Sequence, residues 1–422
     1  MPQEKFHYKS LEEVKQRAAE LGVDLPFAAD THALAQPLTV RNITFPNRLG
    51  IAPMEGADST PEGAPTEYTT RRYVNEAIGG SSVIWFEAIS IVEEGRSSQT
   101  QLLLNRDTLD EFKKMTTAVK EAGLKANGYA PYLIMQANHS GRYSNPGNKP
   151  APMIAYRHPI LEQYRAADDS CIVTDDYLKG LEEKFGEAAT LAKEAGFDAV
   201  DIKSCHGYLL AELASAYNRP GEYGGSFENR CRFPLLMLEE IKKVAGNDML
   251  IEIQFSAEEP EGGYTLEEGI EFLKKAQKYV DIVQVRAADG DYNHPIPFEL
   301  NPTPFLELTE KIKKANLDFV VSNVGGWFYP EMAEKAIAEG KLDMVAMARA
   351  WISNPNYGDL LYEDRADDLV PCLRCNKCHG RGKNDIMTTC CSVNPKFGFE
   401  VVDKFLQKEP GKSKQIAVIG GG

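Results

Sequence analysis

The chain has 422 residues, of which 43% are hydrophobic and 26% charged, enough apolar material for one large core and an appendage. Its formal net charge of −15 argues against a nucleic-acid surface, because such a surface needs Lys and Arg side chains to neutralise phosphates. The N-terminus is charged where a signal peptide needs an apolar run, and no uncharged apolar stretch of about eighteen residues occurs that could cross a membrane. We therefore expect a cytoplasmic protein whose partners are small molecules, with no nucleic acid and no membrane.

The start of the chain predicts one helix followed by a linker. Ser10 and Glu13 have the spacing of a capping box, and an apolar stripe from Leu11 to Leu21 ends at Gly22. We interpret residues 1–33 as a helical extension that docks on the remainder of the protein.

Short apolar runs then alternate with amphipathic helical patterns, as expected for a parallel sheet with crossover helices. In the helix predicted over 177–195, apolar residues recur every three or four positions and Gly196 ends the pattern. Eight such units predict an α/β fold, a (β/α)8 TIM barrel, with an open doubly wound sheet as the weaker alternative. The predicted strands span 49–53, 82–91, 130–137, 199–203, 250–255, 282–286, 318–324 and 344–348.

Five of the eight cysteines fall between residues 371 and 395. In a reducing compartment such a group is more typical of metal binding than of disulfides. Cys372, Cys375 and Cys378 are spaced C-x2-C-x2-C, and Cys391 follows thirteen residues after the third. Three thiolates from one tight turn and one from farther along suit the corners of a [4Fe–4S] cluster. A structural zinc site is the alternative.

The last segment changes in composition at residues 404–414, which we interpret as a linker. It is followed by "QIAVIGGG", an apolar strand that runs into glycines, like the opening of a Rossmann dinucleotide fingerprint. The helix and acidic residue of that fingerprint do not follow, so a simple glycine tail is the alternative. We expect a truncated dinucleotide-binding domain over 404–422, which in the full-length protein binds FAD and NAD(P)H.

Several segments together resemble the old yellow enzyme family, and within it the iron–sulfur branch. That branch includes 2,4-dienoyl-CoA reductase, 2-enoate reductase, trimethylamine dehydrogenase and the bile-acid-inducible flavin oxidoreductases. The resemblance runs from about residue 34 to 395, and the trailing "SVNP" favours Cys391 over Cys390 as the fourth ligand. The segments are "NRLGIAPME", "QANHSGR", "EAGFDAVDIKSCHGYLL", "YGGSFENRCRF", "NVGG" and "MVAMARAWISNP".

The resemblance implies an FMN-binding barrel over 34–370 and a [4Fe–4S] segment over 371–403. FMN would lie across the barrel mouth, and its ring would meet residues at the ends of the first three strands. These are Ala52, Pro53, Met54, Ala88 and Gln136. The loops after strands seven and eight commonly hold a phosphate through backbone N–H groups, which requires small residues. Residues Gly325, Gly326, Ala348 and Arg349 suit that task, although an isolated Gly-Gly is more often a tight turn.

One strand end departs from the family pattern. Many relatives place an Arg at the end of strand five, where its charge favours the anionic reduced flavin, and this chain has Gln254 there. Lys203, at the end of strand four, is the candidate to supply the missing charge or to bind the substrate carbonyl.

The segment "KSCHGY" carries the candidate catalytic residues. Reduction of an activated C=C bond needs a hydride, a donor on the carbonyl and a proton for the α-carbon. The family pattern implies that His206 polarises the carbonyl and that Tyr208 donates the proton, with Lys203 beside them and His294 loosely matching a second active-site His. Without that pattern, Tyr208 packing under a helix and His206 capping it would be equally reasonable. Arg286 and Arg142 are more typical of solvated loop charges than of substrate ligands.

The sequence thus predicts an NAD(P)H-dependent FMN and [4Fe–4S] ene-reductase acting on an α,β-unsaturated carbonyl. An enoyl thioester, an enoate and a steroid or bile-acid enone all remain open as substrates, in either reaction direction. The alternatives are an amine dehydrogenase or N-demethylase of the trimethylamine dehydrogenase type, and an electron-transfer subunit. A homo-oligomer is compatible with each of them.

Overall fold

The computed structural model describes residues 7–22, 32–259, 262–286, 303–378 and 390–398. The strands are β1 Leu38–Val40, β2 Ile43–Phe45, β3 Leu49–Ile51, β4 Val83–Ser90, β5 Tyr132–Asn138, β6 Ala199–Ser204, β7 Leu250–Ser256, β8 Ile282–Arg286, β9 Val320–Val324 and β10 Met344–Met347. The α-helices are α1 Leu11–Leu21, α2 His32–Ala35, α3 Glu67–Ile78, α4 Leu109–Asn127, α5 Leu161–Tyr164, α6 Asp175–Glu194, α7 Leu209–Ala214, α8 Phe227–Ala245, α9 Leu266–Ala276, α10 Leu306–Lys314, α11 Pro330–Ala338, α12 Arg349–Ser353 and α13 Tyr357–Tyr362. Short 3₁₀ turns are η1 Glu93–Gly95, η2 Gly141–Tyr143, η3 Pro146–Asn148, η4 Asp169–Cys171 and η5 Ala366–Asp368.

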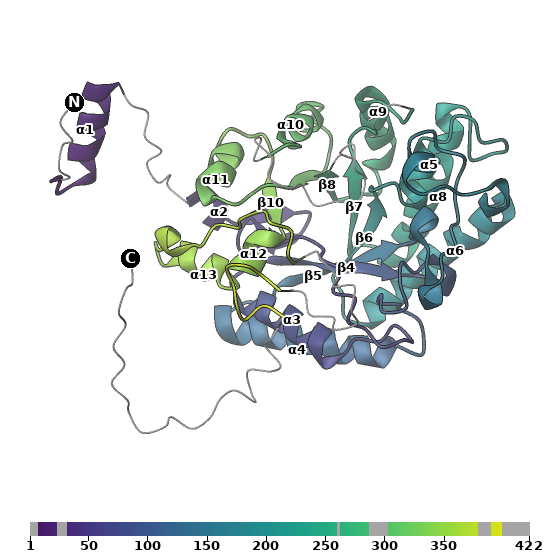
Figure 1. Ribbon diagram of the computed structural model, residues 1–422, viewed down its shortest axis with the longest axis horizontal. Helices are drawn as coiled ribbons and strands as arrows, with labels where there is room; N and C mark the ends of the chain where they lie inside the picture. Colours follow the sequence, from purple (N-terminus) through teal and green to yellow (C-terminus); the bar gives the residue numbers. More distant parts are fainter. Residues whose placement is uncertain (1–6, 23–31, 260–261, 287–302, 379–389, 399–422) are drawn as a thin grey trace.

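Strands β3 to β10 form a closed barrel in the order β10-β3-β4-β5-β6-β7-β8-β9, with every neighbouring pair parallel and helices around the outside (Figure 1). The predicted (β/α)8 barrel is therefore confirmed, and the open sheet is not formed. Each predicted strand corresponds to one barrel strand; for example, the run at 130–137 is β5. The helix predicted over 177–195 is α6, which begins after Thr174, whose side chain accepts the Tyr177 N–H.

An antiparallel hairpin that the sequence did not predict closes one end of the barrel. It consists of β1 and β2, with Leu38 opposite Phe45. The apolar side chains of the hairpin share one buried cluster with Trp85 and with the first residues of several barrel strands, such as Leu250 and Met344. Because these residues begin their strands, the hairpin covers the N-terminal end of the barrel. The C-terminal strand ends are left to form a site.

The N-terminal helix α1 forms at the predicted place and lies to one side of the barrel in Figure 1. Ser10 accepts the Glu13 N–H, and Gly22 ends the helix in a left-handed conformation with φ of 62°. The Glu13 carboxylate accepts the Lys9 N–H, so the capping box is formed on one side only. Docking of this helix stays a prediction. Within the described ranges, no helix has the length and apolar character needed to cross a membrane.

Candidate active site

The turn after β6 places three chemically active side chains in a tightly bent backbone. Strand β6 carries Lys203, and His206 and Gly207 both adopt left-handed conformations, with φ of 62° and 63°. Tyr208 follows as the residue that begins α7. A left-handed conformation is uncommon for a histidine and is found most often where a side chain is aimed for function. This backbone brings the rings of His206 and Tyr208 to a centroid distance of 6.4 Å.

Lys203 is buried, with 8% of its surface exposed, and its Nζ lies 4.2 Å from the centre of the Tyr208 ring. Burial lowers the pKa of Lys203, and the positive charge of Arg286 acts in the same direction. Cys205, Glu55 and Asp201 act in the opposite direction. The structure thus turns the ammonium group toward Tyr208, on the side of the candidate proton donor.

His206 is neutral because burial lowers its pKa well below the ordinary value. Its Nδ1 lies 3.4 Å from the Cys205 sulfur, and the Cys205 thiol donates to Gln254 Oε1 at 3.1 Å. Burial raises the pKa of Cys205 to about 12, so the thiol keeps its proton. With the thiol proton directed to Gln254, Nδ1 is the nitrogen that carries the imidazole proton. The buried Nε2, which has no partner among the described residues, is then an acceptor rather than a donor.

The neighbouring strands β5, β7 and β8 carry the amides of Gln136, Gln254 and Gln284, and one cation, Arg286, lies at the end of β8. Gln136 donates to Asp201 Oδ2 at 2.6 Å, which fixes its amide and leaves its carbonyl oxygen and one N–H for a ligand. Gln254 donates to Gln284 Oε1 at 2.5 Å, and it lies opposite Lys203 in the barrel register. Burial raises the pKa of Asp201 to about 6. The place where relatives are expected to carry Arg is therefore a neutral pair of glutamines.

A buried charge cluster supports the loop after β3, where Ala52, Pro53 and Met54 were predicted to contact a flavin. The Arg72 guanidinium donates to the Met54 carbonyl at 3.2 Å and to Glu87 Oε1 at 2.6 Å. Glu87 is fully buried in β4, and its other oxygen accepts the Gly56 N–H at 3.2 Å. This support was missed from the sequence. A charged residue inside the apolar run "SVIWFEAISI" was the available signal.

Three of the residues predicted to contact the flavin ring pair with neighbouring strands. The Ala52 N–H donates to the Met347 carbonyl at 2.9 Å. Ala88 follows a register irregularity in β4 and lies opposite Gln136, while its carbonyl accepts from Gln101. Ala52, Ala88 and Gln136 thus lie at adjacent strand ends of one barrel.

The predicted phosphate loops follow β9 and β10. Gly325 and Gly326 have φ of 128° and 80°, conformations that favour glycine and expose backbone N–H groups. Ala348 precedes α12, and Arg349 begins it. The Arg349 guanidinium donates to Asn376 Oδ1 at 2.7 Å, so the side chain also reaches the cysteine segment.

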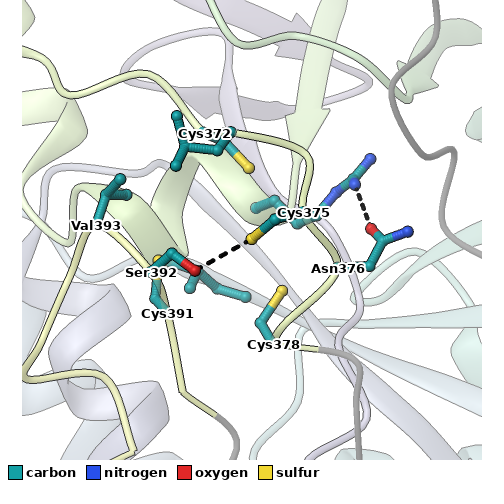
Figure 2. Close-up of a pocket in the computed structure, with 10 residues that line it drawn as sticks. Cys372, Cys375, Asn376, Cys378, Cys391, Ser392 and Val393 are labelled. Atoms are coloured by element: carbon teal, nitrogen blue, oxygen red, sulfur yellow. Dashed lines mark hydrogen bonds between the residues drawn. The ribbon is translucent and has the colours of Figure 1, made fainter.

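The four predicted metal ligands line one pocket (Figure 2). Left-handed conformations at Arg374 and Asn376, with φ of 55° and 56°, coil the chain between the first three cysteines. Other lining residues include Arg349, Asn376 and Ser392, whereas Cys390 is not among them. The cysteines of the pocket are Cys372, Cys375, Cys378 and Cys391.

These thiols could bind either of two kinds of metal centre, a zinc ion or a four-iron cluster. Among the described residues, no three His, Cys, Asp or Glu side chains converge closely enough to hold a single metal ion. A tetrahedral zinc ion needs sulfurs at roughly 2.3 Å from one point, whereas a four-iron cube binds one thiolate at each corner. Burial raises the pKa of Cys378 to about 11, and a hydrogen bond from Ser392 lowers that of Cys375. The four thiols line one pocket, and both kinds of centre use thiolates as ligands.

The remaining residues that the sequence singled out are Arg142, Arg286 and His294. Arg142 is not a solvated loop charge: it is fully buried and donates to Glu212 at 2.5 Å and to Glu162 at 2.6 Å. Because Glu212 belongs to α7, this ion pair holds the helix that Tyr208 begins. Arg286 is half-buried at the end of β8, and His294 lies outside the described residues.

Comparison with known proteins decides the family. Residues 33–368 match the model of the NADH:flavin oxidoreductase / NADH oxidase family. The chain belongs to this family. Its members include old yellow enzyme-type reductases, bind FMN and use NAD(P)H. A protein named NADH oxidase from Thermoanaerobacter brockii is 32% identical over 395 residues, covering 91% of this chain and 59% of the relative.

Two further relatives extend the comparison. A cinnamate reductase from Clostridium sporogenes is 29% identical over 421 residues, covering 92% of this chain and 61% of the relative. The solved structure of a 2-naphthoyl-CoA reductase complex matches with a TM-score of 0.77 at 24% identity, covering 87% of this chain and 58% of that one. This likeness shows the shared fold. The chain spans about three fifths of the length of these curated relatives.

Proposed function

We propose that this chain is the flavin-bearing part of an ene-reductase that reduces a C=C bond conjugated to a carbonyl. The observation that carries the proposal is the group at the end of β6. There a buried lysine, a neutral imidazole and a phenol lie within one turn, with Lys203 Nζ 4.2 Å from the Tyr208 ring centre. This is the set of charges and donors that a reduction of an activated double bond requires.

The residues present fit FMN. The neutral amide of Gln136, held by Asp201, suits the pyrimidine edge of the ring, and the small residues Ala52 and Ala88 leave room beside it. Pro53 and Met54 would complete the ring contacts, with Gln254 and Lys203 at the neighbouring strand ends. Gly325, Gly326, Ala348 and Arg349 would hold the phosphate. FMN, when bound, supplies the hydride.

The chain's own residues would do the remaining work. Tyr208 would give a proton to the substrate α-carbon, and solvent at the barrel mouth would restore it. Lys203 would hold the carbonyl oxygen as negative charge grows on it. His206, with its proton on Nδ1, would not polarise the carbonyl itself, and its Nε2 would accept a hydrogen bond from a donor of the substrate or of solvent. A contribution from His294 stays a prediction.

We further propose that Cys372, Cys375, Cys378 and Cys391 bind a [4Fe–4S] cluster. In a protein as long as the curated relatives, FAD and NAD(P)H would bind beyond the barrel, and the four cysteines would hold a cluster that supplies one-electron transfer. A reducing, cytoplasmic location suits a chain with this many clustered thiols. The alternative of an amine substrate is disfavoured because Lys203 would repel a cationic amine. A pure electron-transfer subunit would need no proton donor such as Tyr208.

One experiment tests the cofactors and the reaction together. The protein is purified without oxygen, its visible spectrum is recorded, and iron, sulfide and flavin are counted. Turnover of a panel of enones and enoates is then measured with dithionite-reduced viologen and with NADH. We expect FMN, four iron atoms per chain as a [4Fe–4S] cluster requires, and turnover with viologen but little with NADH. Zinc in place of iron contradicts the cluster, and the absence of turnover across the panel contradicts the ene-reductase.

A further inference from the structure

We propose that the substrate of this site carries a free carboxylate conjugated to the double bond, and that Lys203 binds this carboxylate. The inference rests on the proposed ene-reductase function and narrows its substrate to an enoate, in place of a thioester or a neutral enone.

Lys203 is buried at the barrel mouth with few partners among the described residues. The side chain is 92% buried at the C-terminal end of β6, where the barrel opens. Among the residues that the structure describes, its Nζ makes no hydrogen bond or ion pair, and it lies over the face of the Tyr208 ring, 4.2 Å from the ring centre. A cation–π contact offsets only part of the cost of removing an ammonium group from water. Lys203 therefore has the character of a binding group without a counter-ion.

The nearby acids Glu55 and Asp201 act on the Lys203 pKa through their charge, but they make their hydrogen bonds to other groups. Glu55 accepts a hydrogen bond from the Ser97 hydroxyl at 2.7 Å. Both oxygens of Asp201 are used, one by the Gln136 amide at 2.6 Å and the other by the Gln254 N–H at 2.8 Å. Burial lowers the pKa of Lys203, so the protein by itself does not favour the charged form. An anionic ligand beside Nζ would favour the ammonium and would itself be stabilised by it.

The reaction creates negative charge on the substrate, and its amount differs between the substrate classes. When a hydride adds to the β-carbon, the π electrons of the double bond move toward the carbonyl group, and the α-carbon then takes a proton. In a neutral enone or thioester this produces one negative charge, which neutral hydrogen-bond donors can stabilise. In an enoate the carboxylate is charged from the start, and a second negative charge develops on it. A full positive charge is the matching group for that case.

His206, Gln254 and Tyr208 are other polar groups near Lys203. Neutral His206 has its proton on the Nδ1 that faces Cys205, so its Nε2 is not a donor to a substrate oxygen. Gln254 donates to Gln284 and Lys203 is its register partner across β6 and β7. A carboxylate at Lys203 would leave the Tyr208 hydroxyl for the α-carbon. The hydride comes from the reduced cofactor of the family, and the proton comes from Tyr208, so the C=C bond becomes a C–C bond with both electrons accounted for.

Binding of two saturated probes tests the inference without turnover. The probes are 3-phenylpropanoate and 4-phenylbutan-2-one, which share a phenyl chain and differ in carrying a carboxylate or a ketone. Dissociation constants are measured by calorimetry for the FMN-loaded wild-type protein, Lys203→Met and Lys203→Arg. Lys120→Met is the matched control, because Lys120 is paired with Asp198 at 2.7 Å on α4, away from the barrel mouth.

We expect the wild-type protein and Lys120→Met to bind the carboxylate at least tenfold more tightly than the ketone. In Lys203→Met the ratio of the two dissociation constants should fall toward one, and Lys203→Arg should restore most of the preference. A wild-type protein that binds the ketone as tightly as the carboxylate overturns the inference, even if Lys203→Met does not fold. An unchanged ratio in a folded Lys203→Met overturns it as well.

Two more measurements separate this inference from its rivals. Viologen-driven reduction is compared for cinnamate and for the matching ketone, benzylideneacetone. If the protein reduces the ketone but neither binds nor reduces cinnamate, the enoate assignment is overturned and the ene-reductase stands. If it reduces neither compound, the proposed function is overturned. The FMN midpoint potential of Lys203→Met should equal that of the wild-type protein. If the FMN potential shifts in Lys203→Met while the ratio of the two probes' dissociation constants stays unchanged, Lys203 acts on the cofactor and the inference is overturned.

Discussion

Replacing Arg72 by Met tests the buried charge cluster that supports the loop after β3. Arg72 Nη2 lies 2.6 Å from Glu87 Oε1, and the Glu87 side chain is fully buried. Without the guanidinium, the donors that this carboxylate keeps among the described residues are the Tyr73 hydroxyl and the Gly56 N–H, both at 3.2 Å. Removing one partner of a buried ion pair costs about 3–5 kcal/mol. We expect Arg72→Met to lower the free energy of unfolding by about this amount.

The pH dependence of this loss follows from Glu87. Burial raises its pKa to about 7 against the opposing effect of Arg72, so removing Arg72 raises it further. A carboxyl with a raised folded-state pKa keeps a proton that the unfolded chain has already released. Its stabilising effect is full below the unfolded pKa and is lost as the pH rises toward the folded pKa, at about 1.4 kcal/mol per pH unit. In the intact protein this loss ends near pH 7, whereas in Arg72→Met it continues above that pH.

Urea unfolding of the apoprotein at pH 7 and pH 8.5 measures the difference. The stability gap between wild type and Arg72→Met should grow by up to ~2 kcal/mol over this interval, from one proton at ~1.4 kcal/mol per unit. Arg72→Met/Glu87→Gln is the control, because it keeps nearby Glu76, whose pKa burial raises to about 8, and removes only the Glu87 charge. Equal pH slopes in the single and double variants would refute the reasoning. FMN should also bind more weakly to Arg72→Met, because Arg72 holds the Met54 carbonyl.

Three further predictions concern the proposed chemistry. Tyr208→Phe should keep a normal FMN content and slow enone turnover by about 10²–10⁴, the usual value of a positioned proton donor; full activity in stopped-flow reoxidation would assign the proton elsewhere. Cys375→Ala and Cys391→Ala should lose iron and sulfide and block electron delivery to FMN from a separate reductase, whereas Cys390→Ala, outside the pocket, should retain both. Because burial lowers the pKa of Lys203, affinity for 3-phenylpropanoate should fall as the pH rises through that lowered pKa, and Lys203→Arg should keep its affinity to higher pH; identical pH profiles would contradict this.

The barrel was predictable because parallel strands are buried on both faces and read as short, continuous apolar runs. The run "MVAMA" is one case, and β10 is found there. The β1–β2 hairpin was missed because each strand has three residues, too few to show an alternating pattern. Its role depends on contacts with Trp85 and other residues inside the barrel, which no local pattern reveals.

The candidate site was predictable in outline and not in its polar contacts. The end of β6 and the turn after it carried Lys203, His206 and Tyr208 in the expected order, but the contact of Lys203 with the Tyr208 ring and the left-handed backbone at His206 could not be read from that order. Arg142 was misjudged because an arginine in a loop is usually solvated. Its partners Glu162 and Glu212 lie 20 and 70 residues away in sequence, and only the fold brings them together.

The loops after β9 and β10 connect the proposed phosphate site to the cysteine pocket. Phe328, which follows Gly326 by two residues, is contacted by two guanidinium groups, with Arg349 at 5.4 Å and Arg374 at 4.9 Å from its ring centre. Arg349 comes from the loop after β10, and Arg374 lies between the first two cysteines of the pocket. Arg349 lines that pocket and also bonds Asn376. Arg349 therefore contacts both the loop after β9 and the cysteine segment, so we expect a change at Arg349 to affect both proposed centres.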